Sequence, residues 1–169
     1  MYLIILIFPL LSFILSGAFG RYFGRLGSAF LSTFGLFLSF ISGLFLFYEV
    51  CICQSVVSLK LYNWILLDIY SIEIGLLFDT VSVLMIVVIT TISFFVHLYS
   101  TAYMGHDPHL SRFMSYLSLF TFFMLILVTS DNFFQLFLGW EGKINYCPKW
   151  KFILNIIFCV CFFLLIKKH

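Results

Sequence analysis

Long apolar stretches separated by short polar segments dominate the order of residues along this chain. A helix needs about 20 predominantly apolar residues to cross a bilayer. The stretches that predict helices are residues 2–19, 29–53, 80–100 and 113–130, with a further one from 133 onward. The pattern therefore predicts an all-α membrane protein, a multi-pass bundle of about five or six transmembrane helices.

The segment 57–79 has a different pattern. Apolar and polar residues alternate from Val57 to Leu61 and again from Tyr70 to Leu76. A period of two is typical of β-strands, in which successive side chains point to opposite faces. The sequence predicts a short extramembrane β-hairpin here, and it predicts Asp79 as the N-cap of the helix that follows.

Small residues recur at helical spacing in the first two predicted helices. Such residues let a neighbouring helix approach closely. The positions are Ser12, Ser16, Gly20, Ser32, Gly35, Ser39 and Gly43. We interpret both stripes as packing faces and the glycine- and arginine-containing segment Gly20–Ser28 between them as a loop.

Composition narrows the class of protein. The chain has 169 residues, of which 63% are hydrophobic and 9% charged, whereas soluble domains carry about 25% charged residues. A net charge of +2 gives no reason to expect nucleic acid. The five cysteines lie mostly in apolar runs, and their spacing predicts neither a disulfide framework nor a metal site.

The first candidate for chemistry is Glu141, ten residues after Asp131 in an apolar run. Ten residues of helix rise about 15 Å, so Glu141 lies near the midplane if Asp131 marks the membrane edge. A carboxylate there costs about 3 kcal/mol and typically serves ion or proton movement. The alternative is that Glu141 pairs with a neighbouring cation or reaches the interface.

A second, weaker candidate is His97. Thr90, Ser93, His97 and Thr101 share one face of the third helix, and a polar stripe in a membrane helix faces protein or water. A histidine in such a stripe is able to relay protons. A histidine that only packs within the bundle explains the pattern as well.

The residues around these candidates resemble a known family. Arg112–Gly142, with its GWEG ending, and Leu76–Met104 closely resemble chain 5 of the proton-pumping NADH:ubiquinone oxidoreductase, respiratory complex I, as does the start of the chain. The resemblance implies a membrane subunit that contributes to proton translocation. Glu141 matches the fifth-helix glutamate of that family, whereas His97 does not match its central group. The family has relatives among cation/proton antiporters.

The resemblance stops after Gly142, where lysines and Pro148 enter the expected fifth span. A lysine near a helix centre costs about 3 kcal/mol in a membrane, and proline breaks helices. We predict that Lys143–Lys151 is irregular or interfacial and that 152–166 forms at most a short membrane helix. The predicted regions of the chain are therefore two transmembrane helices in 1–56, the hairpin in 57–79, three transmembrane helices in 80–142 and a divergent tail in 143–169.

The sequence leads to expectations about cofactors, partners and alternative functions. The chain has no GxGxxG fingerprint, P-loop or iron–sulfur cysteine set, so we expect no bound NADH, flavin or cluster and no catalysis by this chain alone. The resemblance implies other complex I membrane subunits as partners, in a lipid bilayer, with a separate chain supplying the later helices if the subunit is split. The alternatives are an inactive fragment that only packs, and an antiporter subunit.

Location and orientation follow from the same observations. The resemblance implies the mitochondrial inner membrane, and the lack of an Arg-rich transit sequence predicts an organelle-encoded protein. Cations in short loops mark the non-translocated side. Arg21 and Arg25 therefore predict that the first loop lies in the matrix and that the acidic hairpin 57–79 lies on the opposite side.

Overall fold

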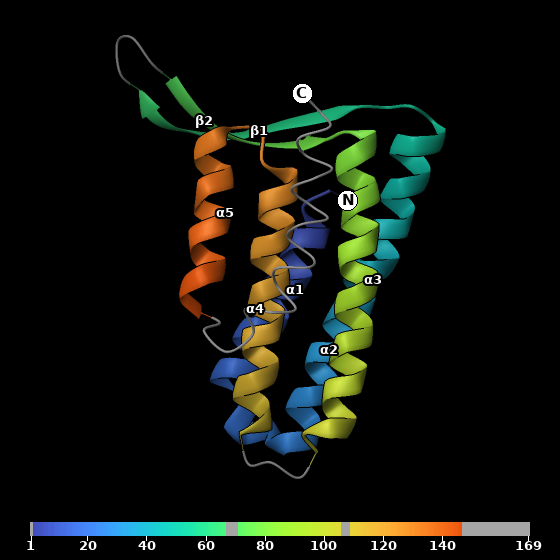
Figure 1. Ribbon diagram of the computed structural model, residues 1–169, viewed down its shortest axis with the longest axis vertical. Helices are drawn as coiled ribbons and strands as arrows, with labels where there is room; N and C mark the ends of the chain where they lie inside the picture. Colours follow the sequence, from blue (N-terminus) through green and yellow to red (C-terminus); the bar gives the residue numbers. More distant parts are fainter. Residues whose placement is uncertain (1, 67–70, 106–108, 147–169) are drawn as a thin grey trace.

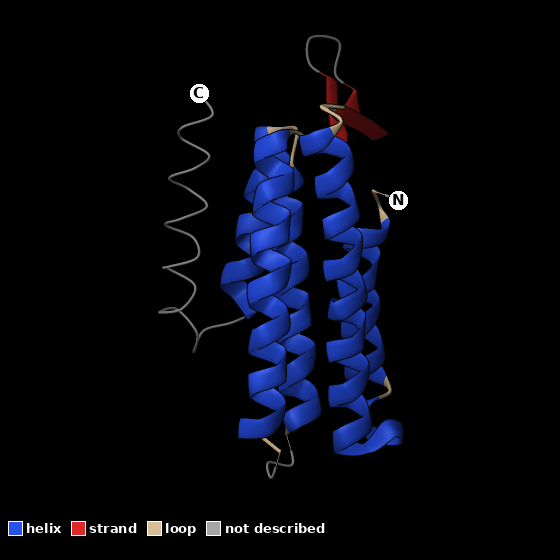
Figure 2. Ribbon diagram, turned by 90° about the vertical axis from the view of Figure 1, so that its right-hand side faces the viewer, coloured by secondary structure: helices blue, strands red, loops and turns tan. Residues whose placement is uncertain are grey.

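The computed structural model describes residues 2–66, 71–105 and 109–146 as a bundle of long helices with one β-hairpin across an end (Figures 1 and 2). The elements in chain order are α1 (Ile4–Ala18), α2 (Gly20–Phe47), a π-helical turn η1 (Tyr48–Ile52), β1 (Val57–Leu66), β2 (Ser71–Phe78), α3 (Thr80–Tyr103), α4 (Leu110–Thr129) and α5 (Phe133–Tyr146). The prediction of an all-α membrane bundle with a small two-stranded sheet is confirmed.

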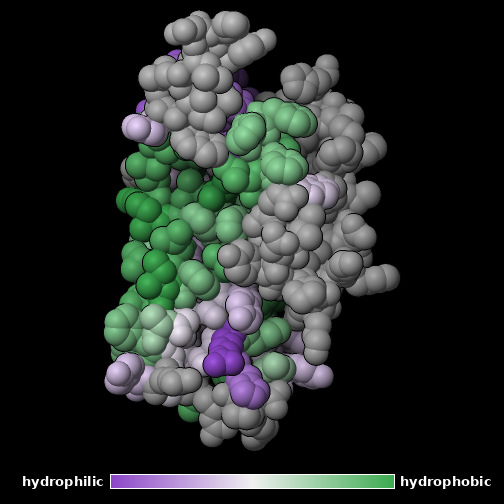
Figure 3. All heavy atoms as spheres, turned by 90° about the vertical axis from the view of Figure 1, so that its left-hand side faces the viewer, coloured by the Kyte–Doolittle hydropathy of each residue, from purple (hydrophilic) through white to green (hydrophobic). Residues whose placement is uncertain are grey.

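Within the described residues, three helical stretches are long and apolar enough to cross a membrane. They are Leu26–Ile52, Thr80–Tyr103 and Leu110–Thr129, and α1 is a shorter apolar helix. Apolar side chains cover the middle of the bundle surface seen in Figure 3. A surface of this kind is matched by lipid or by further helices rather than by water.

The hairpin follows the predicted alternation. β1 and β2 pair antiparallel from Val57 opposite Phe78 to Leu66 opposite Ser71, with irregularities in register after Lys60 and after Asn63. Asp79 occupies the N-cap position of α3 with extended backbone, although its side chain makes no capping hydrogen bond. A bridge between Leu76 and Ser130 joins the hairpin to the turn between α4 and α5.

The small-residue stripes pack helices against one another, as predicted. A Cβ added at Gly35 would come within 2.9 Å of Ser12 Cβ, so α1 and α2 are in close contact there. Ser39 Oγ donates to the Ile5 carbonyl at 3.1 Å across the same interface. One turn beyond Ser39 on α2, Gly43 lies against Thr90 of α3.

The predicted loop Gly20–Ser28 is wrong, because α2 already begins at Gly20. Within it only Gly24 leaves helical geometry, at φ 71°, where α2 is kinked. Glycine adopts a positive φ without a steric penalty, and arginine is a good helix former, so a kinked helix replaces the loop. At its other end the second predicted helix finishes as η1 instead of continuing as α-helix to Cys53.

The fifth helix also departs from the prediction. It begins at Phe133 as expected but continues through Lys143 to Tyr146, so the first residues of the predicted irregular segment are helical. Lysine disfavours a membrane interior without disfavouring helix, and the backbone restriction comes only from Pro148. The rest of that segment and the possible helix 152–166 lie outside the described residues.

Candidate functional site

His97 lies on α3 with none of its surface exposed. Its Nδ1 is 2.8 Å from the backbone carbonyl oxygen of Ser93, one turn earlier. A carbonyl oxygen only accepts hydrogen bonds, so Nδ1 carries the proton and donates it. In the neutral ring Nε2 is then an acceptor, and it has no hydrogen-bond partner among the described residues.

The two threonines of this face, unlike His97, have hydrogen bonds for all of their side-chain polar atoms. Thr90 donates to the Ile86 and Val87 carbonyls, and Thr101 donates to the carbonyl of Leu98. Hydroxyls that bond to their own helix in this way are typical of packing positions. Ser93 Oγ, like His97 Nε2, is buried and has no partner in the described part of the chain. Thr90, Ser93 and His97 of the predicted polar stripe are thus buried, Thr101 is half-buried, and two polar atoms of the stripe have no partner among the described residues.

Glu141 is the ninth residue of α5, in the stretch whose side chains lie outside the description. The position of the α5 backbone relative to α4 is described two residues before Glu141. A Cβ on Gly139 would lie 3.1 Å from the Leu127 backbone nitrogen, so α5 packs closely on α4 at this point. Glu141 follows two residues later, about 3 Å further along the helix axis. Its depth in a membrane stays a prediction.

The two candidates lie on helices that flank α4. α4 packs against α3 on one side and α5 on the other (Figure 1). α3 is also covered by α2. The structure therefore encloses His97 within the bundle and places the helix that carries Glu141 at its edge.

Sequence reasoning missed Gln135, which lies one turn into α5. Its side chain is 9% exposed, and its Oε1 has no partner among the described residues. Neighbouring Asn132 donates from Nδ2 to the Glu73 carbonyl of the hairpin. The signal was present, since Gln135 is a polar side chain in an apolar run and such residues face protein in membrane helices.

A second polar contact at the hairpin end joins distant parts of the chain. Tyr2 Oη donates to Glu49 Oε1 at 2.7 Å, and the Tyr2 ring packs on Phe78 at a centroid separation of 5.3 Å. The Glu49 carboxylate is therefore hydrogen-bonded within this chain, and it joins η1 to the first residues of the chain. This arrangement fits a structural role for Glu49.

Comparison with known proteins identifies the relatives of this chain. Residues 64–114, from β1 into α4, match the family described as NADH-ubiquinone oxidoreductase (complex I), chain 5 N-terminus. His97 lies inside this matched range.

Longer similarities extend over most of the chain. NADH-ubiquinone oxidoreductase chain 5 of Phytophthora infestans is 51% identical over 148 residues, which are 87% of this chain and 22% of the relative. The chain 5 protein of Arabidopsis thaliana is 51% identical over 142 residues, 84% of this chain and 21% of the relative. That of Metridium senile is 49% identical over 142 residues, 24% of its length. This chain thus spans about a fifth of the relatives it matches.

Proposed function

The chain belongs, over most of its length, with the amino-terminal region of the NADH-ubiquinone oxidoreductase chain 5 family, and from this premise we propose that it is part of a proton-translocating membrane subunit of respiratory complex I. Electron transfer from NADH to quinone takes place elsewhere in the complex. The chain is a subunit component of the reductase and is not catalytic by itself. It binds no NADH, flavin or iron–sulfur cluster.

Glu141 is the main proton-pathway residue in this proposal. A proton relay needs both protonation states of a carboxyl group, and burial favours the neutral state unless a nearby cation favours the charged one. α5 contacts α4 along one side, while Phe133 is 84% exposed and Phe137 is 52% exposed on α5. This open apolar side is the observation that carries the proposal, because further helices are able to pack there and supply a cation.

His97 is a secondary proton-pathway residue. Its Nε2 is an unpaired acceptor in a fully enclosed position, and its Nδ1 proton is held by Ser93. A proton that arrives at Nε2 would find a ring already oriented. His97 has no carboxylate within ion-pair distance among the described residues, so a charged ring would need its counter-charge from elsewhere.

The relatives support the cellular setting that we propose. We place the chain in the mitochondrial inner membrane as a multi-pass, organelle-encoded protein, beside other complex I membrane subunits. The helices that its relatives carry beyond this region come either from a separate chain or from further sequence. In both cases Glu141 works only when those helices are present.

The decisive variant is Glu141→Gln in the assembled complex, because glutamine keeps the shape of the side chain and removes its titration. We expect unchanged assembly and at least a severalfold fall in protons pumped per NADH oxidised. Reconstituted complex allows pumping and quinone reductase rate to be measured together. Glu49→Gln is the matched control, since Glu49 is also an acid of this chain and is held by Tyr2.

Full pumping by Glu141→Gln would contradict the proposal and favour a role limited to packing. Equal losses in Glu141→Gln and Glu49→Gln would show a general effect of removing negative charge from this chain, and would also contradict it.

A further inference from the structure

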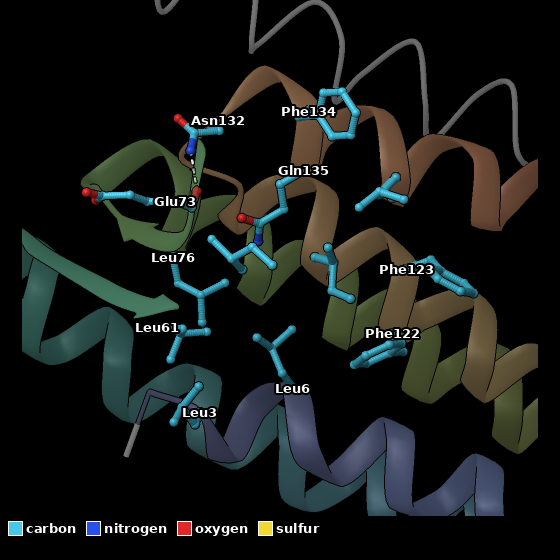
Figure 4. A pocket seen from close by; sticks show the side chains of 14 residues that line it. Leu3, Leu6, Leu61, Glu73, Leu76, Phe122, Phe123, Asn132, Phe134 and Gln135 are labelled. Atoms are coloured by element: carbon cyan, nitrogen blue, oxygen red, sulfur yellow. Dashed lines mark hydrogen bonds between the residues drawn. The ribbon is translucent and has the colours of Figure 1, made fainter. Parts of the chain in front are cut away.

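A pocket of about 380 Å³ lies beneath the hairpin, between α1, α4 and α5 (Figure 4). Its walls are mainly apolar and include Leu6 of α1, Phe122 and Ile126 of α4, Leu138 of α5 and Leu76 of β2. Small-molecule sites typically have volumes of about 300–1,000 Å³ and apolar walls with a few polar groups. The pocket falls within this class.

The polar groups of the pocket gather at its hairpin end. Glu73, Asn132 and Gln135 line it there. Gln135 extends from α5 into the space between the hairpin and α4, as Figure 4 shows, and it is 9% exposed. Its Oε1 has no partner in the described residues. A buried amide oxygen without a partner costs free energy, which a ligand with an N–H or O–H donor would recover.

The charges beside this end favour a cationic donor. Glu73 pairs with Lys60 at 2.7 Å, and the Asp131 carboxylate lies close enough to stabilise the same ammonium. Of these residues Glu73 lines the pocket, and Asp131 adds a second negative charge near Lys60. A ligand with a positive donor group is attracted there, and its remaining apolar part matches the walls along α1, α4 and α5.

We propose that this pocket binds one bilayer phospholipid with a primary ammonium headgroup. An acyl chain lies along the apolar walls, and the ammonium donates a hydrogen bond to Gln135 Oε1 beside the carboxylates. A phosphatidylethanolamine meets this requirement, whereas the quaternary ammonium of a phosphatidylcholine has no N–H to donate. The lipid site is independent of proton translocation.

A packed helix is a poorer occupant of the same space. A helix with its side chains is about 10 Å across, whereas this pocket is bounded by α1, α4 and α5 and at one end by the hairpin. An acyl chain is thin and flexible enough to enter beside Leu138, which is 45% exposed at the edge of the pocket.

The test uses the full chain in nanodiscs that contain equal amounts of phosphatidylethanolamine and phosphatidylcholine. After partial delipidation, native mass spectrometry counts the lipids that remain bound. We expect about a tenfold preference for phosphatidylethanolamine, the size of one charge-assisted hydrogen bond. Mono- and dimethylated headgroups should bind like phosphatidylethanolamine, and the preference should disappear only at the third methyl group.

Variants locate the site. Gln135→Leu should remove the preference between headgroups, and Leu138→Trp should displace the retained lipid by filling the pocket. Phe137→Trp is the matched control, because Phe137 is exposed on the same helix but does not line the pocket. Equal retention of both lipids by the unmodified chain would overturn the proposal. So would a preference that survives Gln135→Leu, or equal effects of the two tryptophan variants.

Discussion

The helices α3 and α5 each carry a candidate titratable residue but are covered very differently. α3 packs against α2 and α4, and Thr90, Ser93 and His97 of its polar stripe are buried. α5 packs on α4 and leaves Phe133, Phe134 and Phe137 exposed. His97 is therefore enclosed by helices of this chain, whereas the surroundings of Glu141 depend on what packs against α5.

The same contrast holds for His97 Nε2 and Gln135 Oε1, two of the buried polar atoms that have no partner among the described residues. His97 Nε2 is enclosed by the bundle, and Gln135 Oε1 lies at a pocket lined by α1, α4 and α5. A buried polar atom without a partner is uncommon and calls for an explanation. We propose proton transfer for the enclosed acceptor and a lipid headgroup for the other, because only the second lines a pocket at the edge of the bundle.

A large structural effect is expected where α5 meets α4. A Cβ in Gly139→Ala would lie 3.1–3.2 Å from Leu127 backbone atoms, which cannot move as a flexible side chain does. We expect a loss of about 1–3 kcal/mol in stability, the usual cost of overpacking. Gly43→Ala is the matched control between α2 and α3, where the nearest atom is 3.6 Å away.

Thermal unfolding in detergent or nanodiscs measures this pair of variants. We expect the melting temperature of Gly139→Ala to be well below that of Gly43→Ala. If the two are equal, α5 does not pack on α4 as described.

A second pair of variants separates the volume of His97 from its chemistry. His97→Ala leaves a cavity in a fully buried position and should cost about 2–4 kcal/mol. His97→Leu fills most of that space and removes the unpaired Nε2, so it should cost about 1 kcal/mol or less. A proton-pathway role predicts that pumping still falls in His97→Leu although stability hardly changes. Unchanged pumping in that variant would make His97 a packing residue.

Much of the fold could be predicted from the sequence, because its causes are local. The alternation of apolar and polar residues in 57–61 and 70–76 predicts a hairpin, and the small residues at 35, 39 and 43 predict close helix contacts. The kink at Gly24 was misread as a loop because glycines and arginines occur in both. Single-residue φ values follow from packing that no local pattern contains.

The candidate site was less predictable. The spacing from Asp131 and the GWEG ending identify Glu141 as a candidate, yet its side chain lies outside the description, so its partner stays a prediction. Gln135 was missed because its significance depends on three other elements that converge on it. The continuation of α5 to Tyr146 was missed because the lysine cost applies to the membrane interior and not to helix formation.

The smallest effect is expected at the hairpin, in Lys60→Met. Hydrogen bonding to Glu73 and the charge of Glu73 raise the pKa of Lys60 above its usual value, with a further contribution from Asp131. A raised pKa stabilises the fold below the unfolded pKa of about 10.4. That stabilisation is lost as pH rises through the higher folded value.

The Lys60 side chain is 73% exposed, so salt screens the pair. The melting temperatures of the unmodified chain and Lys60→Met should therefore differ slightly at pH 8 in low salt, and should converge above the raised folded pKa of Lys60 or in high salt. A difference that persists under both conditions would show that Lys60 stabilises the hairpin by packing instead of charge.

The central claim is that Glu141 conducts protons only with helices packed on the open side of α5. Proton flux into liposomes that contain the full 169-residue chain alone tests it most directly, with an imposed pH gradient and an internal pH-sensitive dye. We predict a flux equal to that of protein-free liposomes. A flux above that level that is abolished by Glu141→Gln would contradict the claim, because the chain would then complete the pathway by itself.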